Sequence, residues 1–170
     1  RKKLFLDLEG FDEKFFVSFE DVDLGWRTWI MGYKVVINPK SIVYHYGGKT
    51  HHSIKNEISF HGLKNQVSIK ITNFEIKYAI SSLVKFFFIF GIRELNILLD
   101  YKIKGKTTIT STKYDETIAA KPNITAILKA LFWIMSNLTY FQNKRKKIHG
   151  YRKVSTTELQ KMNVLSDVQR

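Results

Sequence analysis

The sequence predicts an α/β chain that is rich in helix. Three observations support this fold class: helical spacing over residues 21–31, two short β-type runs at 34–38 and 41–46, and helical patterns through most of 51–170. A length of 170 residues allows a real hydrophobic core, and a hydrophobic content of 44% is too high for a disordered basic tail.

The first predicted helix covers 21–31. Its apolar residues recur on one side, at Val22, Trp26, Trp29 and Ile30. Asp21 suits the N-cap or the first turn, and Gly32 suits the stop. Asp23 and Arg27 are spaced i,i+4, so we expect them to pair on the helix surface.

Two strands are expected after this helix. Residues 34–38 are rich in β-branched side chains and end at Pro39, and residues 41–46 end at Gly47-Gly48. The Gly-Gly pair also marks the best boundary between two regions, 1–50 and 51–170.

The second region is expected to be helical, near 51–73, 75–103, 123–148 and 156–162. The last of these helices begins with a capping box, in which Ser155 and Glu158 satisfy each other's backbone N–H groups. Residues 104–108 and 120–123 are expected to be loops.

The charge is uneven along the chain. The 28 Lys and Arg against 15 Asp and Glu give a net charge of +13, which favours an anionic partner such as nucleic acid, a membrane surface or a phosphorylated substrate. Residues 1–50 carry only +1 of this charge, because seven acids lie there, and residues 51–170 carry +12. The absence of cysteine excludes disulfides, thiolate metal sites and cysteine nucleophiles.

One apolar segment has the character of a membrane-interface helix. Residues 124–141 are too short and too charged for a confident span, but Thr125, Lys129, Ser136, Tyr140 and Asn143 form a narrow polar stripe on an otherwise apolar helix. The basic run 144–147 follows directly. The alternative is an ordinary buried helix with a solvated charge run.

The acids of the first region suggest chemistry. Glu20 and Asp21 stand where an extended segment meets a helix N-terminus, and the helix dipole favours the ionised form of Asp21. An ionised carboxylate there can take a proton from a hydroxyl. His45 ends a strand and can bind a divalent metal or a phosphate. Each feature also has an ordinary interpretation, a helix cap for Asp21 and a hydrogen-bonded surface histidine for His45.

The order of these motifs resembles a known family. The run Gly10-Phe11-Asp12-Glu13, Glu20-Asp21-Val22-Asp23-Leu24, Trp26-Arg27, Gly32-Tyr33 and His45-Tyr46-Gly47-Gly48 is similar to the second half of the catalytic domain in family 2 glycosyltransferases, most of all the rhamnosyltransferase-like enzymes. The match covers about residues 8–48. Glu9 departs from it, because the family usually has glycine there.

The resemblance implies a GT-A fold and an inverting transfer of a sugar from a nucleotide-sugar to a hydroxyl. In that scheme Asp21 is the general base, and His45 helps to bind Mg²⁺ or Mn²⁺ or the diphosphate. The acceptor or sugar region would comprise Gly10, Phe11, Asp12, Glu20, Asp23, Trp26 and Arg27. Within it we expect Asp23 to pair with Arg27 and Trp26 to serve packing.

The resemblance also implies that a nucleotide-binding half lies elsewhere, because residues 1–20 hold no Asp-x-Asp motif. We therefore expect the C-terminal part of a GT-A domain followed by a helical extension, inactive alone, acting on a lipid-linked or polysaccharide acceptor at the inner face of the cell membrane. The alternative is a non-enzymatic basic module that binds nucleic acid or an anionic membrane. We expect no nucleic-acid partner, since no recognisable nucleic-acid motif is present.

Overall fold

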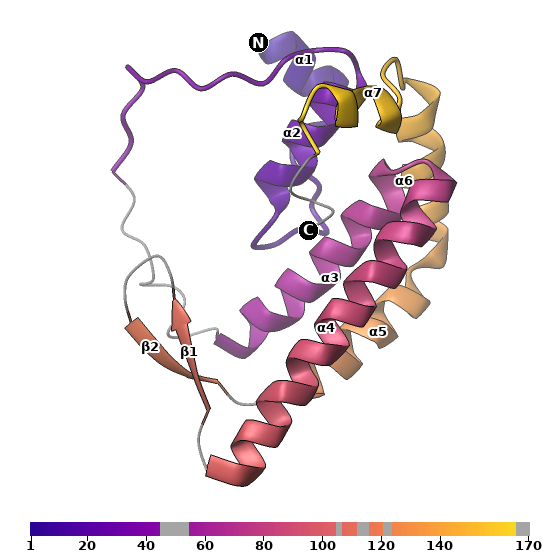
Figure 1. Ribbon diagram of the computed structural model, residues 1–170. Helices are drawn as coiled ribbons and strands as arrows, with labels where there is room; N and C mark the ends of the chain where they lie inside the picture. The colour runs from indigo at the N-terminus through magenta and orange to yellow at the C-terminus, as the bar shows by residue number, and fades with distance from the viewer. Residues whose placement is uncertain (45–54, 105–106, 112–115, 121–123, 166–170) are drawn as a thin grey trace.

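The computed structural model describes residues 1–44, 55–104, 107–111, 116–120 and 124–165. Over these residues the chain is built from helices and one antiparallel hairpin, arranged as in Figure 1. The elements are α1 Lys2–Asp7, α2 Glu20–Ile30, α3 Lys55–Asn73, α4 Ile76–Lys104, β1 Thr107–Ser111, β2 Glu116–Ala120, α5 Ile124–Ser136, α6 Leu138–Gly150 and α7 Thr156–Lys161.

The predicted α/β class is wrong, and with it the part of a GT-A domain. The strands were expected over 34–38 and 41–46, of which 45–46 lie outside the described residues. Residues 34–38 and 41–44 are irregular and pair with no strand in the described part of the chain. They leave the helices along an extended path (Figure 1). Ile37 is 93% exposed and Tyr44 is 96% exposed. A strand needs a neighbour to take its N–H and C=O groups, and no described part of the chain lies alongside these residues as one.

The hairpin lies elsewhere, in a stretch whose first part was expected to be a loop. In β1 and β2, Thr107 is opposite Ala120 and Ser111 is opposite Glu116. The short helix α1 was not predicted either.

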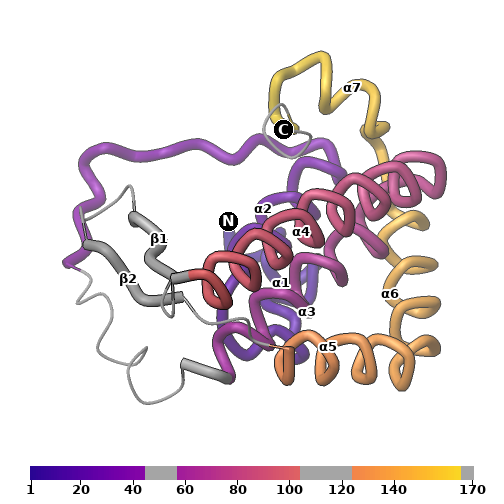
Figure 2. The backbone as a smooth tube through the Cα atoms, turned by 60° about the horizontal axis from the view of Figure 1, so that its bottom comes forward, coloured from indigo at the N-terminus to yellow at the C-terminus, as the bar shows by residue number. Residues whose placement is uncertain are grey.

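The helical predictions are mostly confirmed. The helix α3 is central, since it packs against α2, α4, α5 and α6. Figure 2 shows α4 along one side of α3 and α5 along the other. The capping box at α7 is present, with the Ser155 hydroxyl accepting from the Glu158 N–H and the Glu158 carboxylate accepting from the Ser155 N–H.

The single helix expected over 123–148 is two helices. The axes of α5 and α6 differ by 68° across the break at Asn137. Figure 2 shows the sharp bend between the two helices. The Asn137 side-chain amide donates to the Trp133 carbonyl at 2.8 Å, so a side chain competes with the backbone at the break. No single helix among the described residues is long and apolar enough to cross a membrane, although this bent pair would be by length and composition alone.

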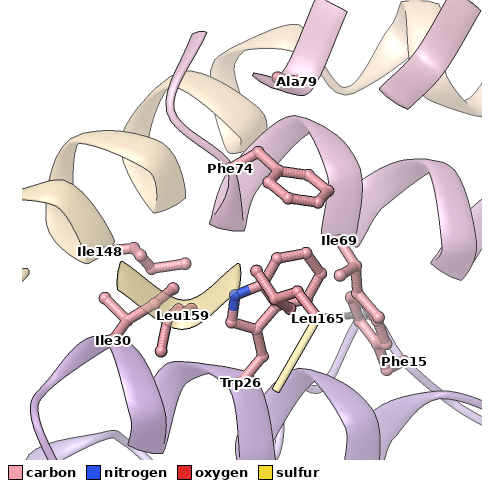
Figure 3. Close-up of a cluster of buried hydrophobic side chains, with 9 residues drawn as sticks. All are labelled: Phe15, Trp26, Ile30, Ile69, Phe74, Ala79, Ile148, Leu159 and Leu165. Carbon is pink, nitrogen blue, oxygen red and sulfur yellow. The ribbon is translucent and has the colours of Figure 1, made fainter. Parts of the chain in front are cut away.

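The main hydrophobic core joins the two ends of the chain. Figure 3 shows Trp26 of α2 against Phe74, with ring centroids 4.5 Å apart and the rings edge to face. The other members come from the loop before α2, from α2, α3, α4, α6 and α7, and from the end of the described chain: Phe15, Ile30, Ile69, Ala79, Ile148, Leu159 and Leu165. Phe15, Trp26 and Ile30 of the first region therefore pack on side chains of the second.

Candidate functional site

A cleft of about 650 Å³ lies between the loop after α1 and one face of α6. The loop contributes residues 8–14, and α2 contributes Arg27. The described residues that line it on the other side recur at helical spacing: Tyr140, Asn143, Lys144, Lys147, Ile148 and Tyr151. The cleft thus combines aromatic rings with amide, carboxylate and ammonium groups.

Two left-handed residues shape the loop. Glu9 has φ 60° and Gly10 has φ +63°. The left-handed backbone favours glycine at position 10, where a Cβ would also stand 2.9 Å from the tip of the Phe5 ring and displace it. The Glu9 carboxylate pairs with the Lys147 ammonium across the cleft.

The predicted Asp23–Arg27 pair is present, but it is buried. The Arg27 Nε donates to Asp23 Oδ2 at 2.8 Å, and the two side chains are 5% and 0% exposed. The two terminal nitrogens of Arg27 donate to the carbonyls of Leu8 and Gly10, at 2.5 and 2.8 Å. Arg27 therefore holds the backbone of the loop at Leu8 and Gly10.

Lys144 of α6 connects this pair with Asp12. Its Nζ lies 2.5 Å from Asp12 Oδ2 and 3.3 Å from each oxygen of Asp23. The Tyr140 hydroxyl donates to the same Asp12 oxygen at 2.5 Å. Burial alone would raise the pKa of Asp12, but the Lys144 charge and the hydrogen bonds from Lys144 and Tyr140 outweigh it, so the pKa is lowered.

The segment between the cleft and α2 is clamped by two buried residues of α3. The Lys64 Nζ donates to the Lys14 carbonyl at 2.5 Å and lies 4.4 Å from the centre of the Trp133 ring. Burial lowers the pKa of Lys64 to about 8. The Asn65 amide donates to the carbonyls of Val17 and Ser18, at 2.9 and 2.6 Å.

The clamp holds strained backbone directly before the candidate base. Ser18 and Phe19 both have left-handed φ angles, 69° and 68°. Such consecutive non-glycine residues cost free energy and persist only where surrounding contacts enforce them. Because α2 begins at Glu20, this turn sets the direction in which its first acids point.

The three acids of the first turn of α2 have different surroundings. Asp21 is exposed, and within the described residues its carboxylate accepts one hydrogen bond, from the adjacent Val22 N–H at 2.8 Å. Glu20 is half-buried, and one of its oxygens is buried without a partner in the described part of the chain. Asp23 is fully buried in the network above.

No family model, curated protein or solved structure matches this chain.

The structure brings together part of the predicted site. Gly10, Phe11, Asp12 and Arg27 line one cleft, and Asp23 supports it from beneath. Glu20, Asp21 and Trp26 are not among its lining residues, and Trp26 belongs to the hydrophobic core, as predicted for packing.

The predicted metal site stays a prediction, because its ligand is not among the described residues. His45 lies outside them, and no group of three or more Asp, Glu or His among them is placed to hold a metal ion. The charge of Asp12 is already balanced by the Lys144 ammonium, and the same carboxylate oxygen accepts a hydrogen bond from the Tyr140 hydroxyl.

The α6 face of the cleft was not foreseen. The sequence did contain evidence for this side of the cleft. One helical face carries Tyr140, Lys144, Lys147 and Tyr151, and the acids of 9–13 have the opposite charge to its lysines. We predicted instead that Tyr140 lies on a polar stripe with Thr125 and Lys129, because we expected a single unbroken helix over 123–148.

Proposed function

We propose that this chain forms the acceptor side of an inverting glycosyltransferase, in which Asp21 accepts the proton of the attacking hydroxyl. The donor is a nucleotide-sugar and the acceptor a lipid-linked or polysaccharide hydroxyl. The proposal rests on the motif order of residues 8–48 together with the placement of the three acids of α2.

The exposure of Asp21 is the observation that carries the proposal. A general base must present an ionised carboxylate to its substrate. The carboxylate of Asp23 is already paired with Arg27 and Lys144. Glu20 is half-buried, whereas Asp21 is exposed at the positive end of the α2 dipole. Of the three, Asp21 is therefore the acid best suited to the role.

The step conserves atoms and charge. The acceptor O–H bond breaks as its oxygen bonds the anomeric carbon, and the anomeric C–O bond to phosphate breaks in the same displacement. The nucleoside diphosphate leaves with that electron pair, and Asp21 keeps the proton.

The cleft beside α2 carries groups that suit a saccharide. Because Asp21 does not line it, the cleft would hold a part of the acceptor remote from the reacting hydroxyl. Sugar rings stack their apolar faces on aromatic side chains and exchange hydrogen bonds with amides and carboxylates. Phe11 is 52% exposed at the cleft, and Tyr140, Asn143 and Glu13 stand around it. The donor would be held mainly by a nucleotide-binding unit, in a longer protein or a separate chain.

The test is sugar transfer by the chain together with its donor-binding unit. We expect Asp21→Asn to reduce kcat by about 10²–10⁴-fold, the usual range for loss of a general base. The midpoint of thermal unfolding should change little, because Asp21 is exposed and its interaction with the α2 dipole contributes at most about 1 kcal/mol.

Asp7→Asn is the matched control. Asp7 is also an exposed acid at the N-terminal end of the chain, where it pairs only with Lys3 of the same helix. Transfer should remain at the wild-type rate in this variant. Undiminished turnover in Asp21→Asn would remove Asp21 as the base and leave Glu20 as the remaining candidate, since Asp23 is buried.

A further inference from the structure

One long helix presents an apolar face that nothing in the described chain covers. The helix α4 has 29 residues, which corresponds to about 43 Å. One side of it packs on α3 through Leu83, Phe86 and Phe90, and Ala79 enters the main core. Nine large apolar residues, each 41–77% exposed, occupy the other side, which we call the α4 ridge: Ile76, Ile80, Val84, Phe87, Phe88, Ile92, Leu95, Leu99 and Ile103.

The spacing makes this a continuous face. At 3.6 residues per turn the nine side chains fall within one half of the helix circumference, opposite the side that contacts α3. A continuous apolar face of this length is unusual on the surface of a monomer and indicates an interaction surface.

The charges on the α4 ridge favour an anionic surface. Three exposed lysines are set into or beside it: Lys77, Lys85 and Lys102. The acids of α4 lie at its margin or away from it, since Asp100 is half-buried on the opposite side and Glu94 is 19% exposed and pairs with Arg93. A symmetric contact with a second copy would bring lysines against lysines.

The basic run of α6 offers less charge to a membrane than the sequence predicted. The basic run 144–147 was predicted to flank a membrane helix, but three of its four residues bind within the chain. Lys144 binds Asp12 and Asp23, Lys147 binds Glu9, and Arg145 donates to the carbonyls of Ile71 and Phe74.

We propose that α4 lies in the plane of an anionic lipid bilayer, with the α4 ridge among the acyl chains and Lys77, Lys85 and Lys102 at the lipid phosphates. An amphipathic helix with an apolar face and lysines able to extend toward headgroups is suited to this position. The charged residues along α4 are compatible with lying in the interface and not with crossing the bilayer. The proposal does not depend on sugar transfer.

The experiment is co-sedimentation of the 170-residue chain with vesicles of phosphatidylcholine alone or mixed equally with phosphatidylglycerol. We expect binding to the anionic vesicles, weakened at least about tenfold by Phe88→Glu. The matched control is Phe132→Glu on α5, because Phe132 is 74% exposed and Phe88 is 68% exposed. Both variants should keep the wild-type circular dichroism.

The lysines give a second, independent readout. Lys77→Gln with Lys85→Gln should weaken binding to the anionic vesicles by about fivefold for each lysine and leave any binding to neutral vesicles unchanged. Absence of wild-type binding to anionic vesicles would overturn the proposal. So would a loss caused by Phe132→Glu and not by Phe88→Glu, or a wild-type dimer in size-exclusion that Phe88→Glu disperses, because the occupant would then be a second copy.

Discussion

The ammonium of Lys144 lies 3.3 Å from both carboxylate oxygens of Asp23, although the two residues are 121 positions apart. One belongs to the basic run near the end of the chain and the other to the acidic motif near its start. The contact shows that part of the net charge of +13 is used to neutralise buried acids. The positive charge of residues 51–170 therefore overstates what the surface offers to an anionic partner.

Removing the Lys144 charge should destabilise the fold. In Lys144→Met, Asp12 loses its cation and Asp23 keeps only Arg27 and Asn73, so two largely buried carboxylates are poorly compensated. We expect the free energy of unfolding to fall by about 3 kcal/mol in urea titrations. Lys146, an exposed lysine in the same run, provides the control. The Lys146→Met substitution should change the free energy of unfolding by less than about 0.5 kcal/mol. Equal losses in the two variants would show that the buried Lys144 contact stabilises the fold no more than an exposed lysine does.

The same contact should make the protein sensitive to acid. Because the folded pKa of Asp12 is lowered, the unfolded chain takes up a proton near the ordinary value of 3.8 while the folded chain still resists it. The stabilisation is complete above about pH 5 and is lost as the pH falls through 3.8 and below. Unfolding measured at each pH should therefore show a shallower acid slope in Asp12→Asn than in the wild type. Parallel slopes would exclude Asp12 as a source of the acid sensitivity.

Lys64 should have its effect at alkaline pH. Burial lowers its folded pKa to about 8 from 10.5, so between these values the unfolded chain holds a proton that the folded chain has released. The free energy of unfolding contributed by Lys64 then rises with pH across this window. Compared with Lys64→Met, the wild type should gain relative stability from pH 8 to 10.5. A constant difference over that range would mean that Lys64 stays charged inside the protein.

Local patterns in the sequence predicted the helices well because helix hydrogen bonds and amphipathic spacing are local. Local patterns gave wrong predictions where contacts with residues distant in the sequence determine the conformation. Residues 34–38 have β-type side chains, but no strand in the described chain lies alongside to pair with them. The break at Asn137 separates Tyr140 from the stripe of Thr125 and Lys129 and turns it toward Asp12.

The candidate site shows the same division. The pairing of Asp23 with Arg27 follows from i,i+4 spacing and could be predicted. Its burial could not, because Lys144 and Asn73, which surround it, come from α6 and α3. Likewise, nothing near Ser18 in the sequence indicates that Asn65 holds its carbonyl.

Replacing Glu9 by glycine should stabilise the loop of the cleft. Glu9 has φ 60°, a conformation that costs a non-glycine residue roughly 1 kcal/mol and costs glycine almost nothing. The Glu9 pair with Lys147 is exposed at the surface and worth at most about 1 kcal/mol, so it would mask the gain in a single variant. In a Lys147→Gln background, therefore, Glu9→Gly should raise the free energy of unfolding by about 1 kcal/mol, whereas Glu9→Ala, which keeps the strain, should leave it nearly unchanged. Urea titrations of the three proteins measure the difference, and equal values for the glycine and alanine variants would show that the left-handed backbone at this position stores no strain.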